Sequence, residues 1–528
     1  MAAKSNKKST SANAIVGSNP SYTRPEVVEL TPRWDMIRDC ISGQEAIKFK
    51  TALYLPKPNP DDQSAENKQR YLDYLNRAVF YNATARTVKG LVGQVFARDP
   101  ILTIPAPMDV FKVDCDGGGL PMDQFARMAL AGVISYGRCG ILTDYPNSTI
   151  PATADDVKKG KRRPTLTYYN AWNVVNWRTM TVGAEKLLSL VVLFESRAVA
   201  DEDNGFSQSY KSYWRVLALD ANGDYISQLW YYDTDEKTYY SEDPFYPTDA
   251  KGQRWKFIPF TFIGSENNES SPDNPPMYDI AVLNVGHYRN SADYEEAVYC
   301  MGQPTLVITG LTEQWVKQVL KNKPIQVGSR AAVALPSGAG AELLQAQPNI
   351  LAKEAMEQKE DQMKSLGAKL IETTQEVART ATEVGIEEAS TTSLLATSAK
   401  NVSHGLTQAL KWAANFFSVS TYNDDSVEYE LNTEFDIARL DPTTIQQLIA
   451  AWQANAITID ELRDNFKRGG IAYEDTDAYL AAINKAGKDL SVPVGSPAST
   501  ADAQMKANAA KAIPASDNSA KGTPAQKP

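Results

Sequence analysis

The hydrophobic pattern changes character twice along the chain. Between residues 26 and 97 apolar positions recur at helical spacing, and residues 121–136 predict another helix that leads into the strand-like run "CGILTDYP". From 164 to 263, runs rich in Val, Tyr, Trp, Thr and Phe alternate with turn signals such as "ANGD" at 221–224, which predicts β-strands. The helical positions before residue 97 are Tyr71, Leu75, Val79, Thr84, Val88, Leu91 and Val95.

A long helix is predicted over residues 277–301. Pro275 and Pro276 fit its first turn, and Gly286 is the one residue inside it that weakens a helix. Its apolar residues do not form a single stripe, so the helix is expected to need neighbours on more than one side. These residues are Met277, Ile280, Ala281, Leu283, Val285, Tyr288, Ala292, Val298 and Tyr299.

A mixed segment and two further helices follow. Within 303–349, Thr312 and Glu313 start a short predicted helix that contains Trp315, between the strand-like runs "TLVIT" and "AAVAL". Residues 351–372 and 386–417 each predict a helix with one apolar side, and "SVEYELNTEFD" predicts one more strand. The two apolar sides consist of Ala352, Met356, Met363, Leu366 and Leu370, and of Leu395, Ala399, Val402, Leu406, Leu410, Ala413 and Phe417.

A helical pair is predicted near the C-terminus. Asp441 with Pro442 starts its first helix, Thr458 and Glu461 form a capping box for the second, and Gly469-Gly470 ends it. A helix-turn-helix DNA reader is disfavoured, because a groove-reading helix should be basic and here the charges cancel. The cancelling charges are Asp460, Glu461 and Asp464 against Arg463, Lys467 and Arg468. A packed helical hairpin is the better interpretation.

Composition sets the limits of this picture. The chain has 528 residues, 43% hydrophobic and 22% charged, which predicts a globular protein of two or more domains. The Ser-, Asn- and Lys-rich arm at 1–26 and the tail at 486–528 are expected to be disordered. No apolar run is long enough for a membrane span, so we expect a soluble protein that is cytoplasmic at synthesis. The net charge of −10 argues against a protein that coats nucleic acid.

The sequence contains few groups suited to catalysis. It lacks a phosphate loop, GxSxG, HExxH and GxGxxG, its four cysteines are scattered, and His287 and His404 are its two histidines, each favoured as structural. "VDCDGGG" at 113–119 and "DEDNG" at 201–205 are interpreted as turns rather than calcium loops. "KKGKRR" at 158–163 is interpreted as a solvated loop. We therefore expect no enzymatic activity, no cofactor and no metal site.

Several segments, in this order, resemble the phage portal proteins, and in particular a portal-like branch described as a domain of unknown function. The N-terminal helices are similar in "YLDYLNRAVFYNATARTVKGLVGQVFARDP", the wing in "GVISYGRCGILTDYP" and "RPTLTYYNAWNVVNWR". The stem is similar in "NPPMYDIAVLNVGHYRNSADYEEAVYCMGQPTLVITG", and the C-terminal helices in "WQANAITIDELRDNFKRGG". The likeness extends over about residues 27–480.

The resemblance implies an α+β portal fold assembled as a ring, usually of twelve subunits, at one capsid vertex of the virion. Double-stranded DNA would pass through its channel during packaging and ejection, and assembly would occur in the host cytoplasm. The implied partners are the terminase large subunit, the major capsid or scaffolding protein and a tail adaptor, with no membrane. The implied segments are an α/β wing (27–275 with 418–439), stem helices (276–302 and 351–372), a small αβ clip (303–350), a tunnel loop (373–385), the helix behind it (386–417) and a helical crown (440–485).

The resemblance also implies the functional surfaces. The two stem helices together carry four more acidic than basic residues, which in a ring would repel the phosphate backbone and keep DNA from adhering. The predicted stem channel face is Glu357, Glu360, Asp361, Lys364 and Lys369. The predicted tunnel loop contacts are Thr374, Gln375, Glu376, Arg379, Thr380 and Thr382. The predicted clip interface is Trp315, Lys317 and Gln318.

Two alternatives remain open from the sequence. One is another non-enzymatic head-tail connector, which should be much shorter than this chain. The other is a metal-dependent nuclease packaged in the virion, which would need a convergent cluster of Asp and Glu. The acidic residues of the stem are instead interleaved with Lys.

Overall fold

The computed structural model describes residues 19–145, 163–200, 204, 206–249, 252–302, 305–320, 335–344, 350–370, 393–416, 426–433, 435, 442–454 and 456–468. The chain divides into two compact units, Met1–Phe435 and Asp436–Pro528. The first unit combines helices with separate antiparallel sheets, which is the predicted α+β class.

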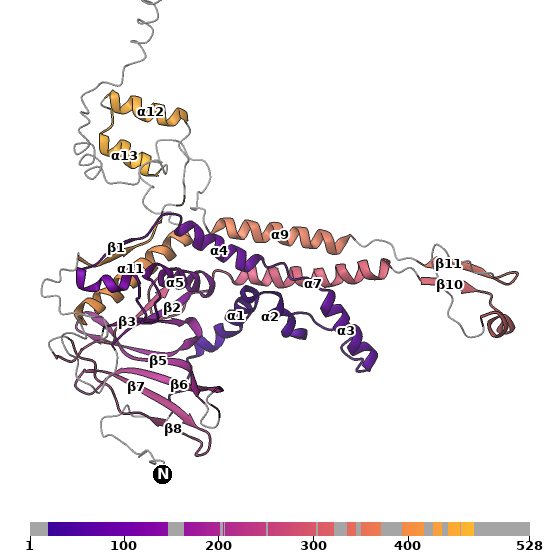
Figure 1. Cartoon of the computed structure of the whole chain (residues 1–528), viewed down its shortest axis with the longest axis horizontal. Coiled ribbons are helices and arrows are strands. Elements are labelled where there is room, and N and C mark those ends of the chain that lie inside the picture. The colour runs from indigo at the N-terminus through magenta and orange to yellow at the C-terminus, as the bar shows by residue number, and fades with distance from the viewer. Residues whose placement is uncertain are drawn as a thin grey trace, which may run out of the picture. The chain divides into compact units, whose positions relative to one another are not determined.

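The helices of the first unit include two long ones, α7 and α9, that lie side by side (Figure 1). α1, α3 and α4 contact α7, α5 and α11 pack on a three-stranded sheet, and α8 follows the strand Thr305–Thr309. The bounds of the helices are α1 (Pro25–Ser42), α2 (Gln44–Phe49), α3 (Ala65–Arg77), α4 (Ala83–Val95), α5 (Met122–Tyr136), α7 (Tyr278–Met301), α8 (Glu313–Trp315), α9 (Leu351–Lys369) and α11 (Leu394–Phe416).

The described residues of this unit form four antiparallel sheets. β4 (Val174–Val182), β5 (Glu185–Ala200), β6 (Gln208–Leu219), β7 (Tyr225–Asp233) and β8 (Thr238–Ser241) form a five-stranded meander. β2 (Arg138–Asp144) lies between β3 (Thr165–Asn170) and β9 (Phe260–Gly264). β1 (Ile101–Thr103) pairs with β12 (Glu428–Glu430), and β10 (Thr305–Thr309) pairs with β11 (Gly340–Leu344). The β1–β12 pair brings the chain back to the N-terminal body after α11.

The main core lies between the β3-β2-β9 sheet and the helices that cover it. Six of the seven residues of β2 are buried, including the polar Arg138 and Thr143. α11 packs on β9 and β2, and its predicted apolar stripe from Leu395 to Ala413 is buried. At Gly405 a Cβ atom would lie 2.5 Å from the Ile263 side chain, so only glycine lets α11 approach β9 this closely.

The structure corrects several predicted boundaries. Residues 26–97 do not form continuous helix through Val79, because α3 ends at Arg77 and α4 begins at Ala83; Val79 is exposed. α11 begins at Leu394 rather than at 386, and the Ser393 side chain caps it by accepting the backbone N–H of Ala396. The strand paired with "TLVIT" is Gly340–Leu344, whereas "AAVAL" lies almost wholly outside the described residues.

The start of the described chain belongs to the fold rather than to a disordered arm. The Arg24 backbone N–H donates to the Val175 carbonyl, and its guanidinium lies 4.5 Å from the centre of the Trp177 ring. Arg138 lies over the same ring at 4.2 Å. Residues 19–26, predicted as part of the arm, therefore lie against β4 or begin α1.

The second unit contains the predicted helical pair, α12 (Pro442–Gln453) and α13 (Ile459–Arg468), which contact each other. The capping box is confirmed. The Thr458 backbone N–H donates to Glu461 Oε2 at 2.7 Å, and the Glu461 backbone N–H donates to Thr458 Oγ1 at 3.2 Å. Of the residues after Arg468, including the predicted stop at Gly469-Gly470, none is described.

Candidate functional site: the paired long helices

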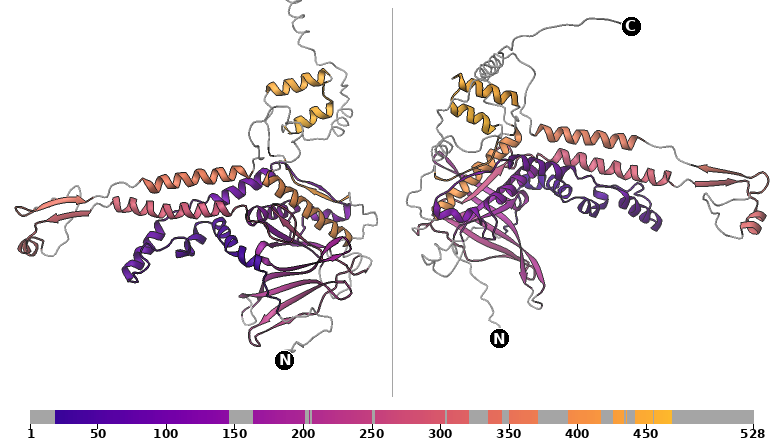
Figure 2. Two further views of the ribbon diagram at one scale, coloured as in Figure 1. Left: turned by 180° about the vertical axis from the view of Figure 1, so that it is seen from behind. Right: turned by 45° about the horizontal axis from the view of Figure 1, so that its top comes forward.

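α7 and α9 are antiparallel neighbours, and Figure 2 shows the same arrangement from two further directions. The base of α7 also contacts α1, α3 and α4. This confirms the prediction that the helix needs neighbours on more than one side. The exposed apolar positions fall mostly in its last turns, where Val298 and Tyr299 are 41% and 48% exposed.

Two buried polar residues of α7 hold the break between α3 and α4. Asn284 Oδ1 accepts hydrogen bonds from the Thr84 backbone N–H at 3.1 Å and the Thr84 hydroxyl at 3.0 Å, while Asn284 Nδ2 donates to the Tyr81 carbonyl at 2.6 Å. Ser291 Oγ accepts the Val79 backbone N–H at 2.9 Å. Neither residue is among the predicted functional residues. Asn284 carries a signal in the sequence, because it is a polar residue between the apolar Leu283 and Val285, whereas Ser291 follows the polar Arg289 and Asn290 and carries none.

The acidic residues farther along α7 face α3. The Tyr74 hydroxyl donates to Asp293 Oδ1 at 2.6 Å, and Arg77 forms an ion pair with Glu296. Burial, and then the hydrogen bond to Asp293, raise the pKa of Tyr74 well above its usual range. These two carboxylates hold α3 to α7, so the expectation that they contribute to an acidic channel wall is corrected.

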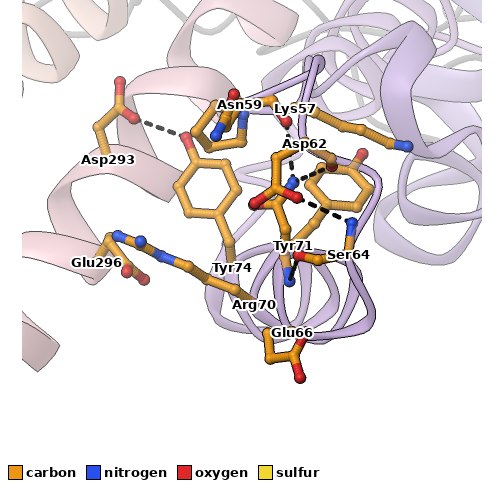
Figure 3. Close-up of a pocket in the computed structure, with 12 residues that line it drawn as sticks. Lys57, Asn59, Asp62, Ser64, Glu66, Arg70, Tyr71, Tyr74, Asp293 and Glu296 are labelled. Atoms are coloured by element: carbon orange, nitrogen blue, oxygen red, sulfur yellow. Dashed lines mark hydrogen bonds between the residues drawn. The ribbon is translucent and has the colours of Figure 1, made fainter.

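A pocket of about 540 Å³ opens beside this contact, between α3, α7 and the segment that precedes α3 (Figure 3). Its wall mixes Lys57 and Arg70 with Asp62 and Glu66, and the Tyr74 side chain points across it to Asp293. Opposite charges alternate around the pocket, and its lining contains no histidine or cysteine. Within the described part of the chain, no group of three or more His, Cys, Asp or Glu residues is placed to hold a metal ion.

α9 docks on α7 through two adjacent contacts. A Cβ atom at Gly286 would lie 3.1 Å from Lys359 Cε, so the lysine stem packs where α7 has no side chain. Next to it, His287 Nε2 lies 3.3 Å from Glu360 Oε1, and its ring lies 5.8 Å from that of Tyr81. Burial lowers the pKa of His287, and the Glu360 hydrogen bond opposes that shift. His404, in contrast, is exposed on α11.

The predicted stem channel face divides into two parts. Glu357, Asp361, Lys364 and Lys369 are exposed, whereas Glu360 turns toward His287. The exposed charges alternate and pair along α9, with Lys353 Nζ 3.7 Å from Glu357 Oε1 and Lys364 Nζ 3.0 Å from Asp361 Oδ1. Three exposed acids, Glu354, Glu357 and Asp361, balance three exposed lysines, Lys353, Lys364 and Lys369. This surface is neutral overall among the described residues, not acidic as expected.

The predicted clip residues lie after β10. Trp315 is half-buried, and its backbone N–H donates to the Thr312 hydroxyl at 3.4 Å, as the predicted helix start requires. Lys317 is exposed and pairs with Glu313, and Gln318 is also exposed. The predicted tunnel loop residues Thr374, Gln375, Glu376, Arg379, Thr380 and Thr382 all lie outside the described residues.

The turn at 113–119 uses its carboxylates internally. Asp114 Oδ1 accepts the backbone N–H groups of Gly117 and Gly119, and Asp116 Oδ1 accepts those of Gly118 and Leu120. Arg163 is buried and lies 2.5 Å from Asp114 Oδ2. The turn interpretation is confirmed, and the last residue of "KKGKRR" belongs to the fold rather than to a solvated loop.

Comparison with known proteins gives a family match over part of the chain and structural overlaps of low similarity, among them two with chains of particle necks. The family model "Domain of unknown function (DUF4055)" matches residues 276–417, from α7 to α11. No curated protein matches the chain. A chain from the "neck of empty GTA particle computed with C6 symmetry" overlaps with a TM-score of 0.35 and 14% identity, over 75% of this chain and 91% of that one. A chain from the "neck of native GTA particle computed with C12 symmetry" gives 0.34 and 14%, over 72% and 88%. At these values the overlaps assign neither fold nor function.

Among the described residues, no helix is long and apolar enough to cross a membrane.

Proposed function

We propose that this chain is the repeated subunit of a portal ring at one vertex of a phage capsid, the channel through which duplex DNA is packaged and ejected. The observation that carries the proposal is the arrangement of α7, the β10–β11 hairpin and α9. The chain leaves the body along one long helix, forms a small two-stranded sheet and returns along a second helix. This order of elements resembles the stem and clip of portal proteins.

Features that a lone subunit leaves uncovered support an oligomer. A two-stranded sheet by itself is marginally stable in water, so the β10–β11 pair gains from neighbours. Leu351, at the start of α9, is 69% exposed, and the last turns of α7 expose Val298 and Tyr299. Apolar groups of this kind at the same end of the helix pair fit contacts between adjacent subunits.

The proposed channel wall follows from the charges of α9. Its exposed acids and lysines balance and pair along the helix, so a passing phosphate backbone would be neither strongly repelled nor held. Arg379, on the segment that joins α9 to α11 in sequence, is proposed to make transient phosphate contacts. We assign no enzymatic step to the chain. The terminase large subunit would supply the motor, and capsid or scaffolding protein and a tail adaptor would bind the ring.

Light scattering and electron microscopy of the purified full chain test this proposal. The expected result is a closed ring with a central hole, and no nuclease or ATPase activity. A stable monomer at micromolar concentration would overturn the ring, and metal-dependent DNA cleavage by the same preparation would favour the nuclease alternative.

Trp315→Ala is expected to impair assembly of the portal ring, because the half-buried indole of Trp315 is large enough to anchor a subunit contact.

A further inference from the structure

The exposed side of α4 and the last turns of α9 form a basic surface. We define the α4–α9 basic face as Arg86, Lys89 and Lys364, all of which are exposed. α4 has no acidic residue, and neither has α9 from Met363 to Lys369. The nearest acid on α9 is Asp361, which pairs with Lys364. The protein as a whole is acidic, with a net charge of −10, so this clustering departs from its average.

Direct contacts bring the two helices together. A Cβ atom at Gly367 of α9 would lie 3.4 Å from the Thr87 side chain of α4. The Arg86 guanidinium lies 5.5 Å from the centre of the Tyr81 ring, and the Lys364 ammonium is within electrostatic range of Tyr81 as well. Figures 1 and 2 both show α4 beside the C-terminal part of α9. The cations of the two helices therefore belong to one surface.

Two glycines leave the middle of this surface flat. Gly90 and Gly93 lie on the exposed side of α4, and a Cβ atom at either position would meet nothing within 4 Å. The inward-facing residues of α4, from Thr84 to Val95, are buried in the core. Glycine disfavours helix, so an exposed pair costs stability that a residue such as alanine would recover. Because glycine has no side chain, a bulky partner can approach this part of α4 closely.

We propose that the α4–α9 basic face contacts the sugar–phosphate backbone of duplex DNA. This inference rests on the proposed function, which brings a duplex to the α7–α9 pair. Arg86 and Lys89 are neighbours on one helix surface, because residues three apart face the same way. Contacts of exposed cations with phosphates are independent of sequence and are screened by salt. The face would therefore guide DNA past the base of α9 without retaining it.

Duplex binding by the full chain provides the test. A fluorescein-labelled duplex of random sequence is titrated with protein by anisotropy at several KCl concentrations. Arg86→Gln/Lys89→Gln is expected to weaken binding about 10-fold at low salt and to reduce the salt slope by about one for each lost phosphate contact. The matched control is Lys186→Gln/Lys211→Gln, which removes the same charge from exposed positions of β5 and β6. Equal weakening by both pairs would overturn the inference.

A second pair of variants separates charge from shape. Gly90→Glu and Gly90→Gln add side chains of the same size to open space and both favour helix. Only Gly90→Glu is expected to weaken DNA binding, because it places an anion between the cations. Equal affinities for the two variants would overturn the inference. So would wild-type affinity in the Arg86→Gln/Lys89→Gln protein.

Electron microscopy of the same preparations keeps the two proposals distinguishable. Rings whose DNA binding is insensitive to the basic-face variants would remove this inference and leave the portal proposal standing. A monomer whose DNA binding depends on Arg86 and Lys89 would do the opposite.

Discussion

α7 and α9 are adjacent helices of similar length, yet their polar side chains are satisfied in different ways. On α7, Asn284, Ser291 and Asp293 bond to the α3–α4 region, more than 200 residues earlier in the sequence. On α9 the ion pairs of Lys353 with Glu357 and of Lys364 with Asp361 stay within the helix, and Glu360 reaches α7 through its contact with His287. One helix is part of the body, and the other is attached to it.

α7 is also more deeply buried than α9. Eight residues of α7 are buried, whereas Met363 is the one fully buried residue of α9. Pairs between exposed charges contribute little to stability, so the folding of α9 depends on a narrow apolar contact. Substitutions in α7 should therefore destabilise the subunit. Substitutions on the outer side of α9 should instead affect mainly its contacts with other molecules in an assembly.

The largest expected effect is at Asn284. Asn284→Ala removes the partner of the Thr84 N–H and the Thr84 hydroxyl, which are buried, and of the Tyr81 carbonyl, which is part-buried. Because orphaned buried groups cost more than the lost bonds, we expect the free energy of unfolding to fall by about 3 kcal/mol. Urea denaturation followed by circular dichroism measures it. Asn290→Ala on the same helix is the control and should change stability by less than about 0.5 kcal/mol; equal losses at both sites would contradict the anchoring role.

A smaller, local effect is expected at Met363. Met363→Ala leaves a cavity at the α7–α9 contact, and such changes cost about 2 to 3 kcal/mol. Hydrogen exchange should show lost protection over residues 351–369 with little change in α1 or α5. Gln362→Ala, at an exposed neighbouring position, should leave exchange unchanged. Loss of protection throughout the first unit would show that α9 is as integrated as α7.

The sequence predicts the long helices because the residue spacings that define a helix are local in the chain. The α11 stripe and the Thr458–Glu461 box are read from spacings of three and four. The start of α4 has a local signal, because Asn82 Oδ1 caps it by accepting the Ala85 backbone N–H, whereas the contacts of Ser291 and Asn284 with the α3–α4 break are not predictable from local spacing. The pairing of β10 with Gly340–Leu344 is likewise not predicted, because strand pairing is a non-local choice.

The sequence predicts which charged residues of α9 are exposed, but it does not predict which charged residues of α7 are used in contacts within the subunit. The exposure of Asp361, Lys364 and Lys369 follows from the apolar side of α9, which the sequence defines. The roles of Asp293 and Glu296 do not, because their partners Tyr74 and Arg77 are distant in the sequence. Counting charges along α7 therefore overestimated the charge available to a channel.

The junction of the two helices should respond to pH. Burial lowers the pKa of His287 below its value in the unfolded chain, so the fold favours the neutral imidazole. Stability from this group is present above the unfolded pKa of about 6.5 and is lost as pH falls through the folded pKa. Glu360 and Lys359 of α9 and Tyr81 face the ring and define its surroundings. We expect the free energy of unfolding to fall between pH 7 and pH 5, by at most about 1.4 kcal/mol for each unit of pKa displacement.

The variant His287→Gln tests whether His287 causes this pH dependence of stability. His287→Gln keeps a group able to donate to Glu360 without a proton to titrate, so the difference in stability between pH 7 and pH 5 should shrink. The remaining dependence would come from carboxylates elsewhere, which the wild-type curve shares. An unchanged difference in His287→Gln would show that the junction does not titrate in this range.

The smallest expected effect is on the outer side of α9, and it is the sharpest test of the comparison. Lys353 and Glu357 are 60% and 62% exposed and lie 3.7 Å apart within one helix, so each stays hydrated and the pair gains little. A double-mutant cycle with Lys353→Ala and Glu357→Ala should give a coupling of about 0.3 kcal/mol that vanishes in high salt. A cycle between Tyr74→Phe and Asp293→Ala, across α3 and α7, should give a larger coupling, because the hydroxyl is buried and bonds to a carboxylate. If the α9 pair couples as strongly as the α7 pair in the isolated subunit, the two helices do not differ in how their charges are satisfied, and the exposed face of α9 is a structural element of the subunit rather than a surface left for partners.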